Sequence, residues 1–206
     1  MRHSLQILGF VCALSLPLAA NAADFTLRLK TVAGQPVPDA VVTIYPVGAA
    51  ATGAYKPEGP LRIVQRDVQF EPFVTVAPTG AEVEFPNRDK VRHHVYSFSA
   101  ANRFQLKLYG REETRKVKFD KVGVVALGCN IHDRMAAFVK VVDTPFAAKT
   151  DASGQAVMHG APAGQVTVKV WQPYMKAPGN EIVRTMTLPR EGMAQDMVVE
   201  LRNYAR

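Results

Sequence analysis

The chain has 206 residues, of which 48% are hydrophobic and 21% are charged, a composition that is typical of folded proteins and argues against intrinsic disorder. Its formal net charge is +7 at pH 7, and the basic residues cluster around positions 87–92 and 103–121. Because the sequence carries no nucleic-acid-binding motif, we expect no nucleic-acid partner, and the basic clusters favour an acidic protein instead.

The first 22 residues predict a secretory signal peptide. Arg2 leads into the apolar run LQILGFVCALSLPLAA, and a small-x-small cleavage sequence ends at Ala22. Ser15 and Pro17 interrupt the run, which is shorter than the roughly 20 residues that span a bilayer. We therefore predict export, cleavage after Ala22 and no integral membrane segment in the mature chain.

Cleavage would change both the charge and the sulfur content of the chain. Arg2 and Cys12 leave with the signal, so the mature chain has 24 Lys and Arg against 18 Asp and Glu, a charge of +6, and keeps Cys129 alone. A lone thiol in an oxidising compartment is buried and inert, paired between chains, or bound to a metal. The role of Cys129 is therefore the question that the sequence poses.

Short β-branched or alternating runs between Gly and Pro predict an all-β fold, and their spacing is typical of β-sandwiches or barrels. The only middle segment where we expect a turn or two of helix is ANRFQLKLYG. The expected strands are FTLRLK, AVVTIYPV, FVTVAP, AEVEFP, HHVYSFS, KVKFD, GVVALGC, AFVKVVD, QVTVKVW and DMVVELR.

Two flanking stretches carry turn signals that belong together, although more than a hundred residues separate them. The signals are a Gly-x-Pro-x-x-x-Ala-x-Val opening and later Thr-Asp-x-x-Gly and Pro-x-Gly turns. The stretches resemble the carboxypeptidase regulatory-like, or transthyretin-like, β-sandwich. The resemblance implies one discontinuous sandwich, residues 23–62 with 146–206, into which a second β domain, residues 63–145, is inserted. The matching residues are Gly34, Pro36, Ala40, Val42, Thr150, Asp151, Gly154, Pro162 and Gly164.

The stretch GCNIHDRM brings Cys129, His132 and Met135 within seven residues, at the end of an expected strand. Thiolate, imidazole and thioether groups suit a soft metal ion. Zinc sites more often collect several thiolates or a third nitrogen and seldom use Met. With a second imidazole, the set favours copper in a distorted trigonal geometry.

The second imidazole has two candidates in RHHVYSF. Side chains alternate between the faces of a strand, so His93 shares its face with Val91 and Val95, whereas His94 shares its face with Tyr96. This parity favours His93 as the ligand that points into the sandwich. His94 stays open as an alternative ligand or as a residue that orients the Cys129 loop.

Residues 63–145 resemble the cupredoxins, the plastocyanin, pseudoazurin and amicyanin class of blue-copper domains. The matching motifs follow the family's order and end in Cys-x-x-His-x-x-Met. The resemblance implies a Greek-key β-sandwich with one type 1 copper ion. It implies His93, Cys129, His132 and Met135 as metal ligands, and His94 and Asn87 as residues behind the ligands or alternative ligands. The other matching positions are Pro78, Gly80, Val83, Phe85, Phe119 and Gly123.

The whole pattern also resembles periplasmic proteins labelled methylamine-utilisation or plastocyanin-like in Gram-negative bacteria. That resemblance implies a periplasmic electron route but names no donor or acceptor. Four protein ligands with no open position permit electron exchange and exclude substrate binding at the metal, so we predict an electron carrier and no enzyme. Arg88, Arg103 and Arg134 are expected near the exposed edge of His132, where they would attract an acidic redox protein.

Two other functions stay open. A periplasmic copper chaperone or scavenger would use the same four ligands with an exchangeable metal. A non-catalytic interaction module would instead use the outer β-sandwich to bind its partner.

Overall fold

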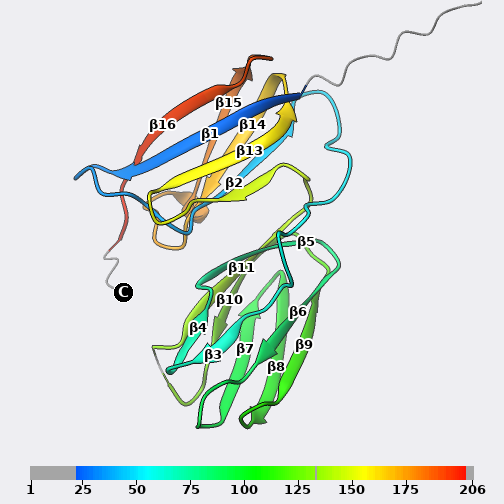
Figure 1. The fold of residues 1–206 in the computed structure, drawn as a ribbon, viewed down its shortest axis with the longest axis vertical. Coiled ribbons are helices and arrows are strands. Elements are labelled where there is room, and N and C mark those ends of the chain that lie inside the picture. The colour runs from blue at the N-terminus through cyan, green and yellow to red at the C-terminus, as the bar shows by residue number, and fades with distance from the viewer. Residues whose placement is uncertain (1–21, 133, 203–206) are drawn as a thin grey trace, which may run out of the picture.

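The computed structural model describes residues 22–132 and 134–202 (Figure 1). Within these ranges the chain has sixteen β-strands and one short 3-10 helix, η1 (Pro178–Asn180), so the predicted all-β class is confirmed. The predicted signal peptide lies outside the described residues, except for Ala22, where β1 begins. None of the helical segments in these ranges is both long and apolar enough to cross a bilayer.

Strands from the two ends of the chain form the upper unit in Figure 1, which we call the outer unit. The first strand of the described chain pairs in parallel with the last strand, so these two strands lie side by side although they are far apart in the sequence. One sheet has the order β13-β1-β16, with β1 at Ala22–Thr31, β13 at Gln155–Pro162 and β16 at Met193–Val199. The other has the order β12-β2-β14-β15, with β2 at Val41–Pro46, β12 at Ala147–Lys149, β14 at Gly164–Trp171 and β15 at Glu181–Leu188.

The middle of the chain forms the lower unit in Figure 1, the inner unit. Its largest sheet has the order β5-β11-β10-β7-β8, with β5 at Val74–Pro78, β7 at His93–Ser99, β8 at Asn102–Tyr109, β10 at Gly123–Gly128 and β11 at Ala136–Val142. Two smaller sheets pair β3 (Val64–Arg66) with β4 (Gln69–Glu71) and β6 (Ala81–Pro86) with β9 (Thr114–Phe119).

None of the sheets in the described chain mixes strands of the two units. Each unit also has its own cluster of buried apolar residues, which include Phe25 in the outer unit and Phe119 in the inner unit. From this separation we propose that residues 23–62 with 146–206, and residues 63–145, are two domains, the second inserted in the first.

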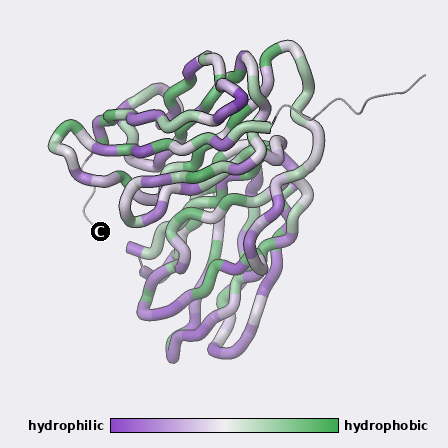
Figure 2. Tube along the Cα trace, turned by 45° about the horizontal axis from the view of Figure 1, so that its top comes forward, coloured by the Kyte–Doolittle hydropathy of each residue, from purple (hydrophilic) through white to green (hydrophobic). Residues whose placement is uncertain are grey.

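Alternation of apolar and polar residues explains why these segments form strands. In β1, Phe25, Leu27 and Leu29 are buried, whereas Asp24 and Arg28 are exposed. Because side chains on a strand alternate between its faces, this pattern buries one face of β1 against the outer core. Figure 2 shows the same mixture of hydrophobic and hydrophilic residues along the strands of both units.

The expectation of helical turns in ANRFQLKLYG is wrong, because this segment is the strand β8. Its side chains alternate between partly buried Phe104 and Leu106 and exposed Arg103, Gln105 and Lys107. A period of two is the signature of a strand, and pairing with β7 provides the hydrogen bonds.

An apolar junction joins the two units. Trp171 of β14 packs edge-on against Phe138 of β11, with ring centroids 5.9 Å apart. Beside them, Lys140 of β11 forms an ion pair with Glu181 of β15 at 2.8 Å, and its Nζ lies 5.4 Å from the Trp171 ring centroid. Val74 contributes to the same buried cluster. The inner unit is therefore packed against the outer unit through side chains as well as joined to it by the chain.

Candidate metal centre

Asn87 organises the loop that leads into β7 and His93. The Asn87 side chain is fully buried, and its Nδ2 donates hydrogen bonds to the carbonyl oxygens of Val91 at 2.9 Å and Tyr109 at 3.1 Å. Its Oδ1 accepts a hydrogen bond from the Asp89 backbone N–H at 2.9 Å. All three of these hydrogen bonds are made to backbone atoms, so Asn87 fixes the path of the chain that leads to His93.

The loop between β10 and β11 supplies the other predicted residues. Cys129 and Met135 are buried, with 4% and 2% of their surface exposed, and they belong to the same apolar cluster. His132 is partly exposed, and its carbonyl oxygen accepts the Met135 backbone N–H at 3.0 Å. This bond closes a tight turn that returns the chain to β11.

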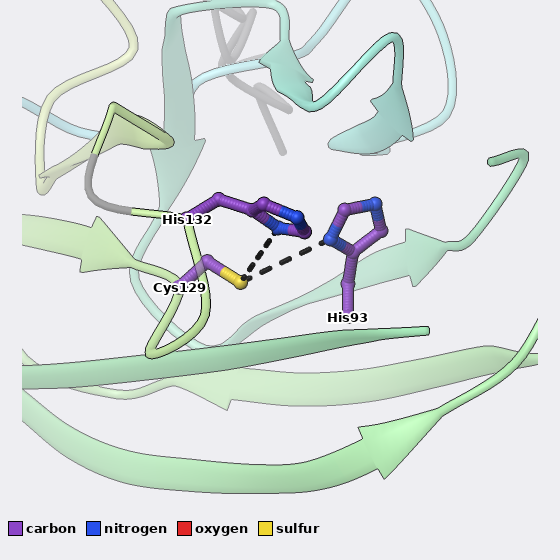
Figure 3. Close-up of side chains that lie close together, drawn as sticks. All are labelled: His93, Cys129 and His132. Carbon is purple, nitrogen blue, oxygen red and sulfur yellow. Dashed lines mark hydrogen bonds between the residues drawn. The ribbon is translucent and has the colours of Figure 1, made fainter. Parts of the chain in front are cut away.

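His93, Cys129 and His132 point toward one another (Figure 3). The Cys129 Sγ lies 3.9 Å from the Nδ1 atoms of both His93 and His132, and the three ligand atoms all lie within 4.8 Å of one another. His93 is fully buried. The two imidazole rings are 5.0 Å apart between centroids and inclined by 60°, so they do not stack on each other.

This spacing fits a shared metal ion. A metal–sulfur distance of about 2.3 Å and a metal–nitrogen distance of about 2.0 Å place two ligands of one ion about 3.5–3.9 Å apart when the angle at the metal is about 110–130°. The observed 3.9 Å corresponds to the wide end of that range and is long for a hydrogen bond to sulfur. One thiolate and two imidazoles form a donor set for a soft or borderline transition metal.

Sequence reasoning missed Asp89, which contacts His93 from the side away from Cys129. The Asp89 Oδ2 lies 2.6 Å from the His93 Nε2. Burial alone would raise the pKa of Asp89, but hydrogen bonds from Val68, His93 and Asp67 outweigh it and hold that pKa below its usual range. The Asn-x-Asp turn pattern at residues 87–89 was the available signal, because it places a carboxylate two residues after Asn87 and four residues before His93.

His94 is buried but stands apart from the three converging residues. Its Nε2 lies 2.9 Å from the Gln105 Nε2 of β8, whereas its Nδ1 is buried with no hydrogen-bond partner. Burial lowers the pKa of His94, which keeps the ring neutral at pH 7. No hydrogen bond in the described ranges joins this ring to the Cys129 loop, so an orienting role for His94 rests on the sequence pattern alone.

A buried polar contact lies in the same buried cluster as Cys129. The Tyr109 hydroxyl donates to the Phe85 carbonyl oxygen at 2.8 Å and accepts a hydrogen bond from the Gln65 Nε2. Burial is the largest cause that raises the Tyr109 pKa to about 12, and the Cys129 thiolate also raises it. These groups indicate a dry environment around the thiol.

The three predicted surface arginines do not gather at one place. Arg134 is exposed beside the site, one residue before Met135, and Arg88 is exposed and paired with Glu112. Arg103 pairs with Phe98 at the far end of β8, whereas Tyr109 pairs with His93. Six residues of extended strand span about 20 Å. The expectation that Arg103 lies near His132 is therefore corrected.

No protein-family model matches the sequence, and none of the curated proteins matches it. Among solved structures, the chain is similar to a purple cupredoxin from Nitrosopumilus maritimus, at 19% identity and a TM-score of 0.36 over 39% of this chain and 98% of that one. The chain is also similar to a reduced amicyanin variant, at 18% identity and a TM-score of 0.38, over 49% of this chain and 98% of that one. A copper-containing nitrite reductase from Thermus scotoductus SA-01 gives 24% identity and 0.39, over 57% of this chain but 28% of that one.

Proposed function

We propose that this chain is a periplasmic type 1 copper protein of the cupredoxin kind, which carries electrons between redox partners. The observation that supports it is the convergence of His93, Cys129 and His132, with both Nδ1 atoms 3.9 Å from one Sγ in a largely buried pocket. The proposed ligands are these three residues and Met135, whose side chain is buried at the end of the same loop. Copper bound there would supply one-electron exchange between its cupric and cuprous states.

The chain's own residues would keep the site rigid and dry. His93 and Cys129 come from different parts of one sheet, because Gly128, which precedes Cys129, pairs with Tyr96 of β7. A Cβ on Gly128 would lie 2.7 Å from the end of the Tyr96 ring, so a larger residue here would require the ring to shift. A frame that holds ligands in one arrangement limits their movement when the charge of the ion changes.

His132 is the proposed point of electron entry and exit. It is the partly exposed member of the three, whereas His93 and Cys129 are buried. Arg134 is exposed close by in the same loop, and the full chain carries a net charge of +7. An acidic redox protein is therefore the proposed partner, with Arg134 and Arg88 as candidate contacts.

The proposed site has four protein ligands and leaves no position for a substrate, so we propose a carrier rather than an enzyme. The periplasmic location rests on the predicted signal peptide. The resemblance to methylamine-utilisation and plastocyanin-like proteins supports an electron route, and it does not identify methylamine as a substrate.

A copper titration tests this proposal. The protein is purified from the periplasm of an expression host and titrated with Cu(II), and its visible absorption is recorded beside that of Cys129→Ser. We expect one equivalent of copper and an intense thiolate-to-copper band that the variant lacks. Reduction of the copper by ascorbate should bleach the band. An oxidised redox protein of higher potential should then accept the electron and restore the band.

His159→Gln is the matched control, because His159 is exposed in the outer unit and pairs with Asp24 there. It should leave the band unchanged. A wild-type protein that binds copper without a thiolate band, or binds none, would overturn the proposed function.

A further inference from the structure

The β3–β4 hairpin holds the carboxylate that contacts His93. The Asp89 Oδ1 accepts the Asp67 backbone N–H at 2.8 Å, and the Oδ2 accepts the Val68 backbone N–H at 3.0 Å. Asp67 and Val68 form the turn between β3 and β4, and both have positive φ, 51° and 57°. Residues other than glycine rarely adopt this backbone conformation, and β-branched residues such as valine adopt it least. The turn is thus held in an unfavourable geometry that aims two N–H groups at one carboxylate.

Three donors converge on the two oxygens of Asp89. The His93 Nε2, at 2.6 Å, shares Oδ2 with the Val68 N–H, while the Asp67 N–H takes Oδ1. An ionised carboxylate carries no donor hydrogen, so both of its oxygens can accept these bonds at once. Asparagine of the same shape would turn its NH₂ toward one of these N–H groups. The Asp89 side chain is 11% exposed and that of His93 is fully buried, so water competes little for these bonds.

The contact fixes which nitrogen of His93 carries the proton. A carboxylate on Nε2 requires the proton there, and the Nδ1 lone pair then faces the Cys129 Sγ 3.9 Å away. A carboxylate behind a ligating imidazole also raises its basicity and fixes its orientation. The added negative charge favours the ion of higher charge.

We propose that Asp89, held by the β3–β4 turn, is a positioning residue for the metal centre: it sets the tautomer and orientation of His93 and favours Cu(II) over Cu(I). The inference rests on the proposed copper site for its metal, although the tautomer of His93 belongs to the metal-free protein. The turn of the hairpin, residues 67 and 68, thus supports His93 through Asp89.

The test compares Asp89→Asn with Asp120→Asn, which removes the same charge from an exposed position on the inner unit. Cu(II) affinity is measured by competition with a chelator, and the reduction potential is measured by redox titration. Asp89→Asn should bind Cu(II) about 10–100-fold more weakly. Its reduction potential should rise, because Cu(I) loses less stabilisation than Cu(II). Asp120→Asn should match the wild type in both.

A second measurement needs no substitution, so it holds even if Asp89→Asn fails to fold. Nitrogen-15 NMR of the metal-free wild-type protein should show His93 protonated at Nε2 and unprotonated at Nδ1, with a slowly exchanging Nε2 proton. The opposite tautomer would overturn the inference. So would a wild-type copper band together with unchanged affinity and potential in Asp89→Asn. A wild-type protein with no copper band would overturn the proposed function instead, and the tautomer result would still decide the role of Asp89.

Discussion

The two β-sandwich units bury polar side chains for different purposes. In the outer unit, the buried Thr150 hydroxyl donates to the carbonyl oxygen of Val37 at 2.8 Å and so connects distant segments of backbone. In the inner unit, the buried His93 lies beside Cys129 in the group of possible metal ligands. Buried polar groups therefore join backbone segments in the outer unit, whereas in the inner unit they include the candidate metal centre.

Unsatisfied groups follow the same division. Most buried side-chain N and O atoms without a partner in the described ranges belong to the inner unit: Gln65 Oε1, Thr75 Oγ1 and His94 Nδ1, against Gln172 Nε2 in the outer unit. Buried polar groups without partners are costly in folded proteins and concentrate at functional sites. Both units bury polar side chains, and most of the buried atoms left without a partner in the described ranges belong to the inner unit.

The largest expected effect comes from a substitution in the inner unit. Cys129→Ser should abolish the visible copper band, because serine cannot supply a thiolate. Far-ultraviolet circular dichroism of the metal-free variant should match that of the wild type, since the residue volume changes little. A variant that keeps the band would show that another group provides the chromophore.

A core substitution in the outer unit should have the opposite signature. Phe25 is 1% exposed in the outer core, and Phe25→Ala should lower the free energy of unfolding by about 3–5 kcal/mol, measured by urea denaturation of the metal-free protein. The copper band of the folded fraction should not shift. A displaced band would mean that packing of the outer unit controls the ligand geometry. The two units would then not be independent in this respect.

The junction decides whether the two units unfold together. Lys140 and Glu181 are paired at 2.8 Å, with side chains 13% and 23% exposed. Glu181→Ala should cost about 1–3 kcal/mol, because a partly buried ammonium group loses its charged acceptor. Calorimetry should show one transition for the wild type and a broader or double transition for the variant. Glu191→Ala, in an exposed turn of the outer unit, serves as the control. An unchanged single transition in Glu181→Ala would locate the coupling in the apolar contacts alone.

The smallest effect concerns acid stability of the outer unit. Hydrogen bonds from Ser153 and Gln155 lower the pKa of Asp151 from its usual value of 3.8. A carboxylate with a lowered folded-state pKa stabilises the protein above its unfolded pKa, and this contribution is lost as the pH falls through the folded value. Between about pH 5 and pH 3, the melting temperature of Asp151→Asn should therefore fall less than that of the wild type. Equal slopes would contradict this assignment.

Most strands and the candidate ligands could be predicted from the sequence, because their signals lie within short segments. The spacing of Cys129, His132 and Met135 within one loop pointed to a shared site, and strand parity favoured His93 over His94. The structure brings three of these residues, His93, Cys129 and His132, close together. Alternation predicted most strands, and it should also have identified β8, where Phe104 and Leu106 alternate with polar residues.

Other features depend on tertiary placement and leave little local trace. The strand β15 was not expected, because its exposed residues hide the pattern, yet it completes the outer sheet by pairing with β14. The contact of Asp89 with His93 needs the turn at Asp67 and Val68, which lies more than twenty residues earlier in the chain. Such a contact follows from how a hairpin packs, and no periodicity of a single segment reports it.

The central claim is that one copper ion is bound by His93, Cys129 and His132 in the inner unit. Extended X-ray absorption fine structure at the copper edge of the Cu(II)-loaded protein tests it most directly. We expect two imidazole nitrogens and one short copper–sulfur distance, with the sulfur contribution absent in Cys129→Ser. A shell of nitrogen and oxygen with no short sulfur in the wild-type protein would show that Cys129 does not bind the ion.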